Sequence, residues 1–181
     1  MSFSFAKYQS LKNHPDTTNG VVSFWHETEP DYGIFSNWAP TPLFYDNRQF
    51  SSSEHLFMYM KAKLFDDTSV IKLLENQNLA QFEIKKLGRQ VQNFKQETWD
   101  KHKYHFMYVA LLTKAEQTPE FTTTLQNTKN TLIVEASPRD TIWGIGIKAS
   151  DPRIETPANW LGENALGTLL MMVRDDLPNN K

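Results

Sequence analysis

The sequence predicts a single α+β domain that is mostly helical and carries a few short strands. Segments with helical patterns cover more of the 181 residues than segments with strand patterns. The candidate strands do not alternate regularly with helices, which argues against a doubly wound parallel sheet. The 12 Phe, 6 Tyr and 5 Trp residues supply enough apolar surface for one core in a chain of this length.

The first twenty residues are polar and end in a turn-rich stretch, Asn13–Gly20. We therefore expect residues 1–20 to form a loose N-terminal extension with at most a little local structure, and residues 21–181 to form the domain. The domain begins with a strand at residues 21–26, where β-branched and aromatic side chains follow one another.

A proline-rich loop follows at residues 27–42, and a second strand is predicted at residues 43–45, with Asp46 and Asn47 as its turn. The first clear helix then begins in a run of three serines. The hydroxyl of a serine caps free backbone N–H groups, and Glu54 stands three places after Ser51, as a capping box requires. This helix ends near Phe65.

Further segments follow from apolar spacing and helix-stop signals. Gly88 is expected to close the third helix, and Gly162 to lead into the last one. Helices are predicted at residues 69–76, 79–87, 99–116 and 163–175, with a strand at 131–135.

Composition excludes several classes of protein. The net charge is −2, from 19 Lys and Arg against 21 Asp and Glu, so bulk charge does not hold this chain to nucleic acid. The absence of Cys excludes disulfides, thiolate metal sites and a thiol nucleophile. There is no run of ~18 apolar residues and no signal-peptide pattern at the N-terminus. We expect a cytoplasmic protein with no membrane partner.

The five histidines show no metal-ligand spacing. His102 and His105 stand three residues apart on one predicted helix, but no third ligand accompanies them. No metal is therefore expected.

The helix after Ser53 contains the most informative pattern. Glu54, Met58 and Lys61 lie at i, i+4 and i+7 and so share one helical face. Apolar residues occupy much of the rest of the helix. The carboxylate and the ammonium therefore either point into a lined pocket or form an ordinary pair exposed to solvent.

A second pattern runs from Glu135 to Gly146. The chain leaves a strand, turns at Pro138 and presents Asp140 three residues before Trp143. Trp143 offers a flat stacking surface, and Gly144 and Gly146 allow the backbone to approach a ligand closely. The alternative is a turn whose Trp caps the core.

A third pattern places Gly162 and Gly167 on either side of a helix start, where a phosphate or a ribose hydroxyl can approach exposed N–H groups. Glycines at such positions also serve helix packing alone. Arg89, directly after Gly88, presents a guanidinium whose fork geometry suits a phosphate, although an ordinary surface Arg is equally consistent with the sequence.

Taken in order, these motifs closely resemble the NADAR family, also called the YbiA-like N-glycosidases. The resemblance covers about residues 22–175. It rests on a series of short motifs, each weak when taken alone: Phe24-Trp25, Tyr32-Gly33-x-Phe35-Ser36-Asn37-Trp38, Ser53-Glu54-His55-x-Phe57 with Lys61-Ala62, Gly88-Arg89, Trp99-Asp100, Glu135 with Asp140-x-x-Trp143-Gly144-x-Gly146, and Trp160-x-Gly162-x-Asn164-x-Leu166-Gly167.

The resemblance implies a YbiA-like fold and hydrolysis of an N-glycosidic bond between ribose and a base or amine. It implies two classes of substrate: phosphoribosylated pyrimidine intermediates of early riboflavin synthesis, and ADP-ribose attached to guanine, including guanine in DNA. The expected partner is a small phosphorylated ribosyl or ADP-ribosyl molecule, with ADP-ribosylated DNA as a second possibility. No metal or organic cofactor is needed for such a hydrolysis.

This chemistry suggests roles for the three candidate catalytic residues. Glu54 is the first choice for a carboxylate beside the sugar, where it stabilises positive charge or orients water. Asp140 is the second, either as general acid/base or as a residue that holds ribose hydroxyls. Lys61 has two open roles: it pairs with phosphate or orients Glu54, or its amine attacks the anomeric carbon and forms an imine, which requires a lowered pKa.

The remaining candidates are expected to bind the substrate. Stacking on the base is assigned to Trp99 and Trp143, with Tyr32 and Phe35 as further walls. Contacts to phosphate and ribose are assigned to Ser36, Asn37, Arg89, Asn164 and the backbone of Gly167, with Gly144 allowing close approach. Lys85, Lys86, Arg89 and Lys95 are candidates for a local basic patch. The rival hypothesis is a non-catalytic module that binds ADP-ribose or a nucleotide through the same contacts.

Overall fold

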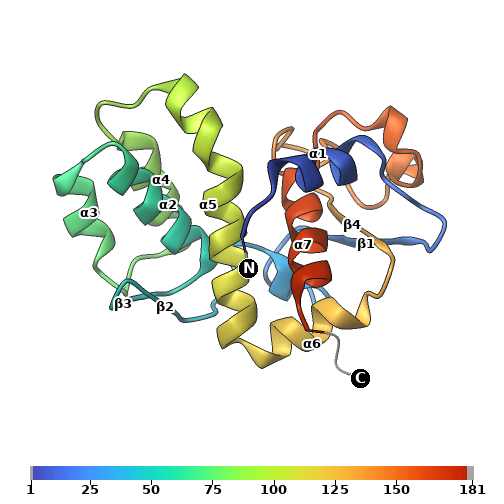
Figure 1. Ribbon diagram of the computed structural model, residues 1–181, viewed down its shortest axis with the longest axis horizontal. Helices are drawn as coiled ribbons and strands as arrows, with labels where there is room; N and C mark the ends of the chain where they lie inside the picture. Colours follow the sequence, from blue (N-terminus) through green and yellow to red (C-terminus); the bar gives the residue numbers. More distant parts are fainter. Residues whose placement is uncertain (1, 179–181) are drawn as a thin grey trace. The chain divides into compact units, whose positions relative to one another are not determined.

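The computed structural model describes residues 2–178, which contain seven α-helices and four short strands (Figure 1). This confirms the predicted mostly helical α+β class. The described chain forms two compact units. The central unit comprises residues 37–118, and the terminal unit comprises residues 2–36 together with residues 119–178.

The central unit is built around helix α2 (Ser53–Leu64), whose residues are mostly buried. Helices α3 (Thr68–Leu74), α4 (Gln81–Gln90) and α5 (Gln96–Gln117) all pack against α2. The strands β2 (Leu43–Tyr45) and β3 (Arg48–Phe50) pair as an antiparallel hairpin, of which the sequence analysis missed β3. Helix α2 is therefore the element that every other helix of this unit contacts.

The N-terminus of α2 differs from the predicted capping box. Ser52 is the N-cap, and its Oγ accepts a hydrogen bond from the backbone N–H of His55 at 3.1 Å. Ser51 instead donates its backbone N–H to Nδ1 of His55. The prediction of a capping box between Ser51 and Glu54 is therefore wrong. The helix begins one residue later than that pairing requires, and Glu54 lies in its first turn.

Helix α4 continues to Gln90, so the prediction that Gly88 ends it is also wrong. Gly88 lies inside the helix, where it faces α2. A Cβ atom added at Gly88 would lie 1.9 Å from the sulfur of Met58. The missing side chain therefore allows α4 to approach α2 closely.

The terminal unit contains a two-stranded parallel sheet of β1 (Val21–Phe24) and β4 (Leu132–Glu135), in which Val21 pairs with Leu132 and Phe24 with Glu135. Helix α7 (Ala165–Asp176) packs on β4. Helix α6 (Pro119–Asn127), which the sequence analysis missed, packs on α7 and on the short helix η1 (Gly33–Phe35). The 3₁₀ helices η2 and η3 span Pro152–Glu155 and Pro157–Asn159.

Residues 5–13 form a further helix, α1 (Phe5–Asn13), where the sequence predicted a loose extension. Ser4 caps this helix, and α1 packs against α7. Tyr8 is fully buried, and Lys7 Nζ lies 2.8 Å from Oδ1 of Asp176. The prediction failed because the helix is polar overall and has a single deeply buried residue, which leaves no apolar period in the sequence.

The two glycine motifs near the C-terminus pack against each other. The backbone N–H of Asn164 donates to Gly144 O, and that of Leu166 donates to Trp143 O. A Cβ at Gly162 would lie 2.3 Å from Gly144 O, and one at Gly167 would lie 2.1 Å from Ile133 O. These glycines thus let backbone segments meet. The N–H groups of Asn164 and Leu166, at the helix start where the sequence suggested a phosphate or ribose contact, bond to carbonyls of the chain instead.

Replacement of Gly167 by Ala should therefore destabilise the protein. Gly→Ala inside a helix ordinarily stabilises by about 0.5–1 kcal/mol, but here the new methyl group meets the Ile133 carbonyl. We expect a loss of about 1–3 kcal/mol, measured by urea unfolding. Gly88→Ala is the comparison, and its loss should be smaller because the nearest atom belongs to the flexible end of Met58. If the urea concentration at the unfolding midpoint were unchanged or higher in Gly167→Ala, the close contact between position 167 and the Ile133 carbonyl would be contradicted.

Helix α5 contains a buried lysine, Lys114. Burial disfavours its ammonium form and lowers the pKa to about 7. In the unfolded chain the lysine keeps its ordinary pKa of 10.5. Between these two values the unfolded state binds more protons than the folded state, so this lysine makes stability rise with pH.

Replacement of Lys114 by Met should remove that dependence. The stability of the variant relative to the natural protein should be highest below pH 7 and should decline as pH rises from about 7 to 10.5. Chemical denaturation at a series of pH values measures this difference. Lys101→Met, at an exposed position of the same helix, is the control and should show a flat difference. A stability difference between Lys114→Met and the natural protein that does not change with pH would contradict the lowered pKa of Lys114.

Candidate functional site

The face of α2 that carries Glu54, Met58 and Lys61 does not point into open solvent. Glu54 is only 7% exposed, and Lys61 is half-buried. Met58, between them, packs against Gly88 of α4. The pair therefore lies in the first and last turns of one buried helix, and a lined pocket around it stays a prediction.

The ammonium of Lys61 is held by a carbonyl and two rings. Its Nζ donates to Gly88 O at 2.8 Å. It also lies 4.5 Å from the ring centroid of Phe94 and 5.2 Å from that of Trp99, within cation–π range. Phe94 is 39% exposed and was missed by the sequence analysis, because it stands in the short connection between α4 and α5 where no periodicity marks it.

The charge on Lys61 depends on three influences. Burial lowers the pKa of the Lys61 ammonium, the Glu54 carboxylate raises it, and the Arg89 guanidinium lowers it. The burial effect is the largest, so the net pKa lies below the ordinary value. Glu54, Lys61 and Arg89 thus form one electrostatic cluster, and the lowered pKa is the condition that an amine nucleophile requires.

Asn37 connects the preceding loop to the start of α2. Its backbone oxygen accepts from the Glu54 N–H at 3.0 Å, and its side-chain oxygen accepts from the Ser53 hydroxyl at 3.2 Å. Asn37 therefore fixes the turn of α2 that carries Glu54. Beside it in sequence, Trp38 has the ammonium of Lys85 5.6 Å from its ring centroid. The central unit thus brings together five predicted site residues: Asn37, Glu54, Lys61, Arg89 and Trp99.

The other predicted residues lie in the terminal unit. Oδ1 of Asp140 accepts hydrogen bonds from the N–H groups of Ile142 at 2.9 Å and Trp143 at 2.7 Å. The carboxylate therefore shapes the turn that presents Trp143, which is half-exposed. A role of Asp140 in acid/base chemistry or in binding ribose stays a prediction.

Asn164, Gly144 and Gly167 serve the packing of this unit. The amide of Asn164 donates to Ile133 O at 2.9 Å, and its side-chain oxygen accepts from the Glu135 N–H at 3.1 Å. A Cβ at Gly144 would lie 2.9 Å from Glu135 O. These residues attach the start of α7 and the Trp143 turn to β4, so the structure uses them within the fold.

Phe35 is fully buried, which corrects its assignment as a wall of the substrate site. Its ring centroid lies 5.7 Å from that of Phe24 and 5.9 Å from that of Phe121, in edge-to-face contacts. Tyr32 stacks on the same ring at 5.6 Å and remains half-exposed. Ser36, the next residue after η1, is also buried.

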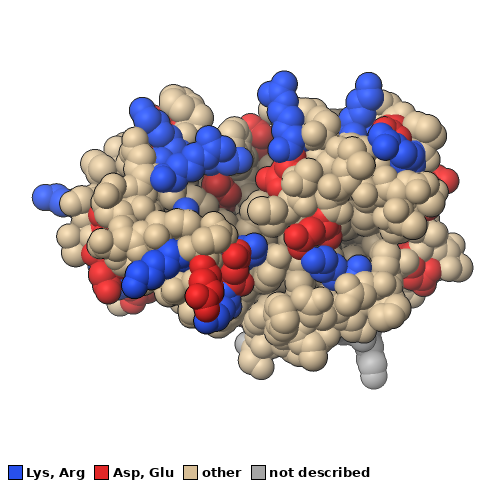
Figure 2. All heavy atoms as spheres, turned by 90° about the horizontal axis from the view of Figure 1, so that it is seen from above, with Lys and Arg blue, Asp and Glu red and all other residues tan. Residues whose placement is uncertain are grey.

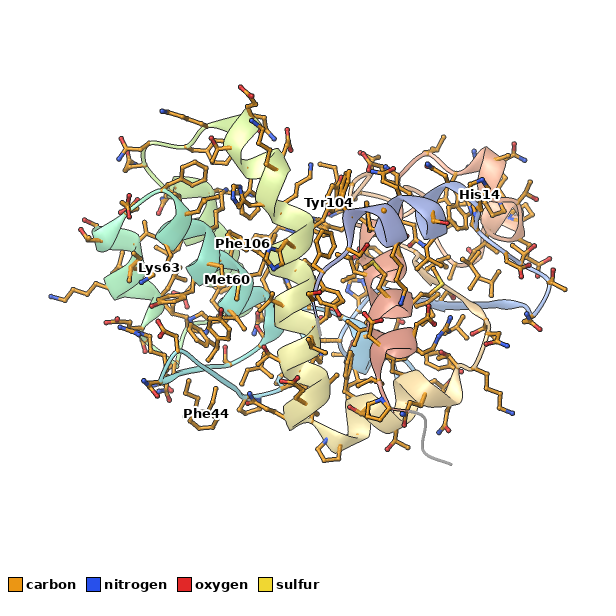
Figure 3. The ribbon with its side chains drawn as sticks, in the orientation of Figure 1. His14, Phe44, Met60, Lys63, Tyr104 and Phe106 are labelled. Atoms are coloured by element: carbon orange, nitrogen blue, oxygen red, sulfur yellow. The ribbon has the colours of Figure 1, made fainter. Side chains whose placement is uncertain are left out.

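The larger hollows of the central unit lie away from Glu54 and Lys61. One of about 540 Å³ lies between α2 and α5 and is lined by Met60, Lys63 and Phe106, among others (Figure 3). Another, of about 710 Å³, lies between α3 and α4. The candidate site is therefore recognised by its chemistry rather than by the size of its cavity.

Across residues 2–178, no three His, Asp or Glu side chains gather as metal ligands. Within the same residues, no helix has the length and apolar character to cross a membrane.

Comparison with known proteins identifies the family. The model of the NADAR domain matches residues 23–178. The chain belongs to the NADAR family. Within that family, an N-glycosidase of Acanthamoeba polyphaga mimivirus is 39% identical over 149 residues, which cover 79% of this chain and 86% of the viral protein. The N-glycosidase YbiA of Shigella boydii is 30% identical over 161 residues, covering 89% of this chain and 91% of YbiA.

The NADAR fold is also matched by a solved structure. The NMR structure of Escherichia coli YbiA superposes with a TM-score of 0.69 at 28% identity, covering 86% of this chain and 83% of YbiA. The YbiA-like fold implied by the sequence motifs is therefore confirmed. The NADAR match includes residues of both the central and the terminal units.

The electrostatic cluster makes a prediction about the Lys61 pKa. Glu54→Gln removes the charge that favours the ammonium, so the pKa should fall further, whereas Arg89→Gln removes a repelling charge, so the pKa should rise. The measurement is the pH dependence of Lys61 acetylation by acetic anhydride, followed by mass spectrometry, with Lys63 as internal reference. If the pKa of Lys61 shifted in the same direction in both variants, the opposite influences of Glu54 and Arg89 on Lys61 would be contradicted.

Proposed function

We propose that this chain is an N-glycosidase that hydrolyses the C–N bond between a ribose and a base or amine in a phosphorylated substrate. The observation that carries the proposal is the cluster of Glu54, Lys61 and Arg89 against the rings of Phe94 and Trp99. The family supports it, because relatives across most of the chain are named N-glycosidases.

The substrate class follows from the charges and rings of the cluster. Arg89 is exposed at the end of α4 and suits a phosphate, and Lys85 beside Trp38 supplies a second cation. Phe94 and Trp99 offer flat surfaces to a base. The two substrates that the family resemblance implies both have these features: a phosphoribosylaminopyrimidine intermediate of riboflavin synthesis, and ADP-ribosylated guanine in a nucleoside or in DNA.

Glu54 is proposed to act beside the sugar. Loss of the base develops positive charge at C1′ of the ribose, and a buried carboxylate stabilises that charge more strongly than one in water. Glu54 lies in the first turn of α2, so the fold holds its carboxylate at the N-terminal end of that helix. The same carboxylate can carry the proton that the departing base requires.

Lys61 is proposed to act as the nucleophile, since burial lowers its pKa and the charge of the Glu54 carboxylate acts on its ammonium. The Lys61 nitrogen forms a bond to C1′, the bond from C1′ to the base breaks, and the base takes the electron pair together with the proton released by Lys61. The C1′–O4′ bond then opens to an imine, and O4′ takes up a proton. Water adds to the imine carbon, and the C–N bond breaks to give the phosphorylated sugar (ribose phosphate or ADP-ribose) and the Lys61 amine.

The first test is release of base, followed by chromatography, from the phosphoribosylaminopyrimidine intermediate and, separately, from ADP-ribosylated guanosine. The natural protein should release the base from one of them, which selects the substrate. Glu54→Gln should slow that release by about 10²–10⁴-fold. Binding of the substrate without release by the natural protein would contradict the enzyme and favour a non-catalytic ADP-ribose or nucleotide module.

A second test separates the two roles of Lys61. Cyanoborohydride added during turnover should reduce the imine and leave a ribosyl adduct on Lys61, detected by mass spectrometry. Lys61→Arg keeps the positive charge but cannot form the imine, so it should lose both the adduct and turnover. Lys63→Arg, at an exposed position of the same helix, is the matched control. Normal release by Lys61→Arg would show that Lys61 acts through charge alone.

A further inference from the structure

The central unit carries a second surface feature, the groove between α3 and α4. This α3–α4 groove has a volume of about 710 Å³. Residues from both helices and from their connection line it, chiefly Lys72, Leu73, Leu79, Phe82, Lys86 and Leu87. Neither Glu54 nor Lys61 is among its residues, so the groove is separate from the candidate active site.

Two large apolar side chains in this groove are exposed to water. Leu73 is 54% exposed and Phe82 is 66% exposed. The inner faces of the same helices are formed by other residues: Val70 and Leu74 of α3, and Ile84 of α4, are buried. Single exposed apolar residues are ordinary, but here two line one hollow together, which is typical of an interaction site.

The charge of the groove is positive. The side-chain ammonium groups of Lys72 and Lys86 form no ion pair or hydrogen bond with any other described residue. The carboxylate of Glu83, which also lines the groove, accepts the N–H of Ala80 at 2.8 Å and so caps α4. Figure 2 shows Lys and Arg side chains projecting from the central unit. The groove thus offers an apolar floor with two unpaired ammonium groups.

We propose that the α3–α4 groove binds an acidic amphipathic helix of a partner protein. The apolar side chains of that helix, at i, i+3 or i+4 spacing, would cover Leu73 and Phe82, and its Asp or Glu residues would pair with Lys72 and Lys86. Both walls of the groove are helices, so it has no strand edge to which an extended peptide could add. The floor is mainly leucine with one aromatic ring, which suits aliphatic anchors better than stacked bases.

The test uses a synthetic peptide, fluorescently labelled and about 14 residues long, or four helical turns. It carries Leu at one face and Glu elsewhere, and its binding is followed by fluorescence anisotropy. Phe82→Ser and Leu73→Ser should each weaken binding by about tenfold or more, because each removes an apolar anchor. Lys72→Glu with Lys86→Glu should do the same and should weaken the salt dependence of binding.

Matched controls use similar residues outside the groove. Phe44→Ser changes an aromatic residue of β2 that is 62% exposed in the same unit, and Lys63→Glu changes an exposed lysine of α2 (Figure 3). Neither should alter the affinity for the peptide. Circular dichroism confirms that every variant keeps its helical content.

Several results would overturn the proposal. One is unchanged affinity in both Phe82→Ser and Leu73→Ser, and another is equal binding of a peptide in which Lys replaces every Glu. Displacement of the peptide by an oligothymidine strand, with the same sensitivity to Phe82→Ser, would assign the groove to nucleic acid. A dimer seen by sedimentation that Phe82→Ser dissociates would assign it to a second copy of the chain. None of these measurements depends on the glycosidase reaction.

Discussion

The close approach of α4 to α2 at Gly88 is the constraint on which the central unit depends. A Cβ at Gly88 would lie 1.9 Å from the sulfur of Met58, so any larger residue there requires the flexible Met58 side chain to move aside. The same approach places the Gly88 carbonyl 2.8 Å from Nζ of Lys61. The missing Cβ therefore contributes both to the packing of α4 on α2 and to the position of the Lys61 amine. The two apparently separate motifs, Glu54 to Lys61 and Gly88-Arg89, act as one feature of the fold.

The environment of Lys61 balances two opposing effects. Burial removes water from the ammonium and lowers its pKa, while the Gly88 carbonyl, the two rings and the Glu54 carboxylate each favour the charged form. A fully desolvated amine without these partners would be costly to bury, and a fully solvated one would remain protonated at neutral pH. Burial and these contacts together keep the lysine ordered and leave its pKa below the ordinary value, which is the direction that the proposed nucleophile role requires.

The sequence predicted the helices and strands that are signalled by residues within or next to the same segment. The run of serines identified the start of α2, and apolar spacing with helix-stop signals placed α3 close to where it lies. It did not identify α1, because a polar helix with one deeply buried tyrosine has no apolar period, nor the short strand β3. The face shared by Glu54 and Lys61 was predictable, but Phe94 was not, since nothing in the short segment around it marks its contact with Lys61. The packing roles of Asn164 and Gly167 were not predicted, because backbone contacts between distant segments leave no signal in a single sequence.

Helix α4 combines two tasks on different faces. Its ten residues direct Gly88 and Ile84 inward, and they place Phe82 and Lys86 in the α3–α4 groove. Exposed Phe82 is not needed to hold the helix, because the buried face and the cap formed by Glu83 already do so. An apolar side chain that contributes nothing to the core still costs solubility, and a polar residue at that position would avoid this cost. The exposure of Phe82 therefore supports the proposed partner helix because, unlike the similarly exposed Phe44, Phe82 lines a groove together with a second exposed apolar side chain, Leu73.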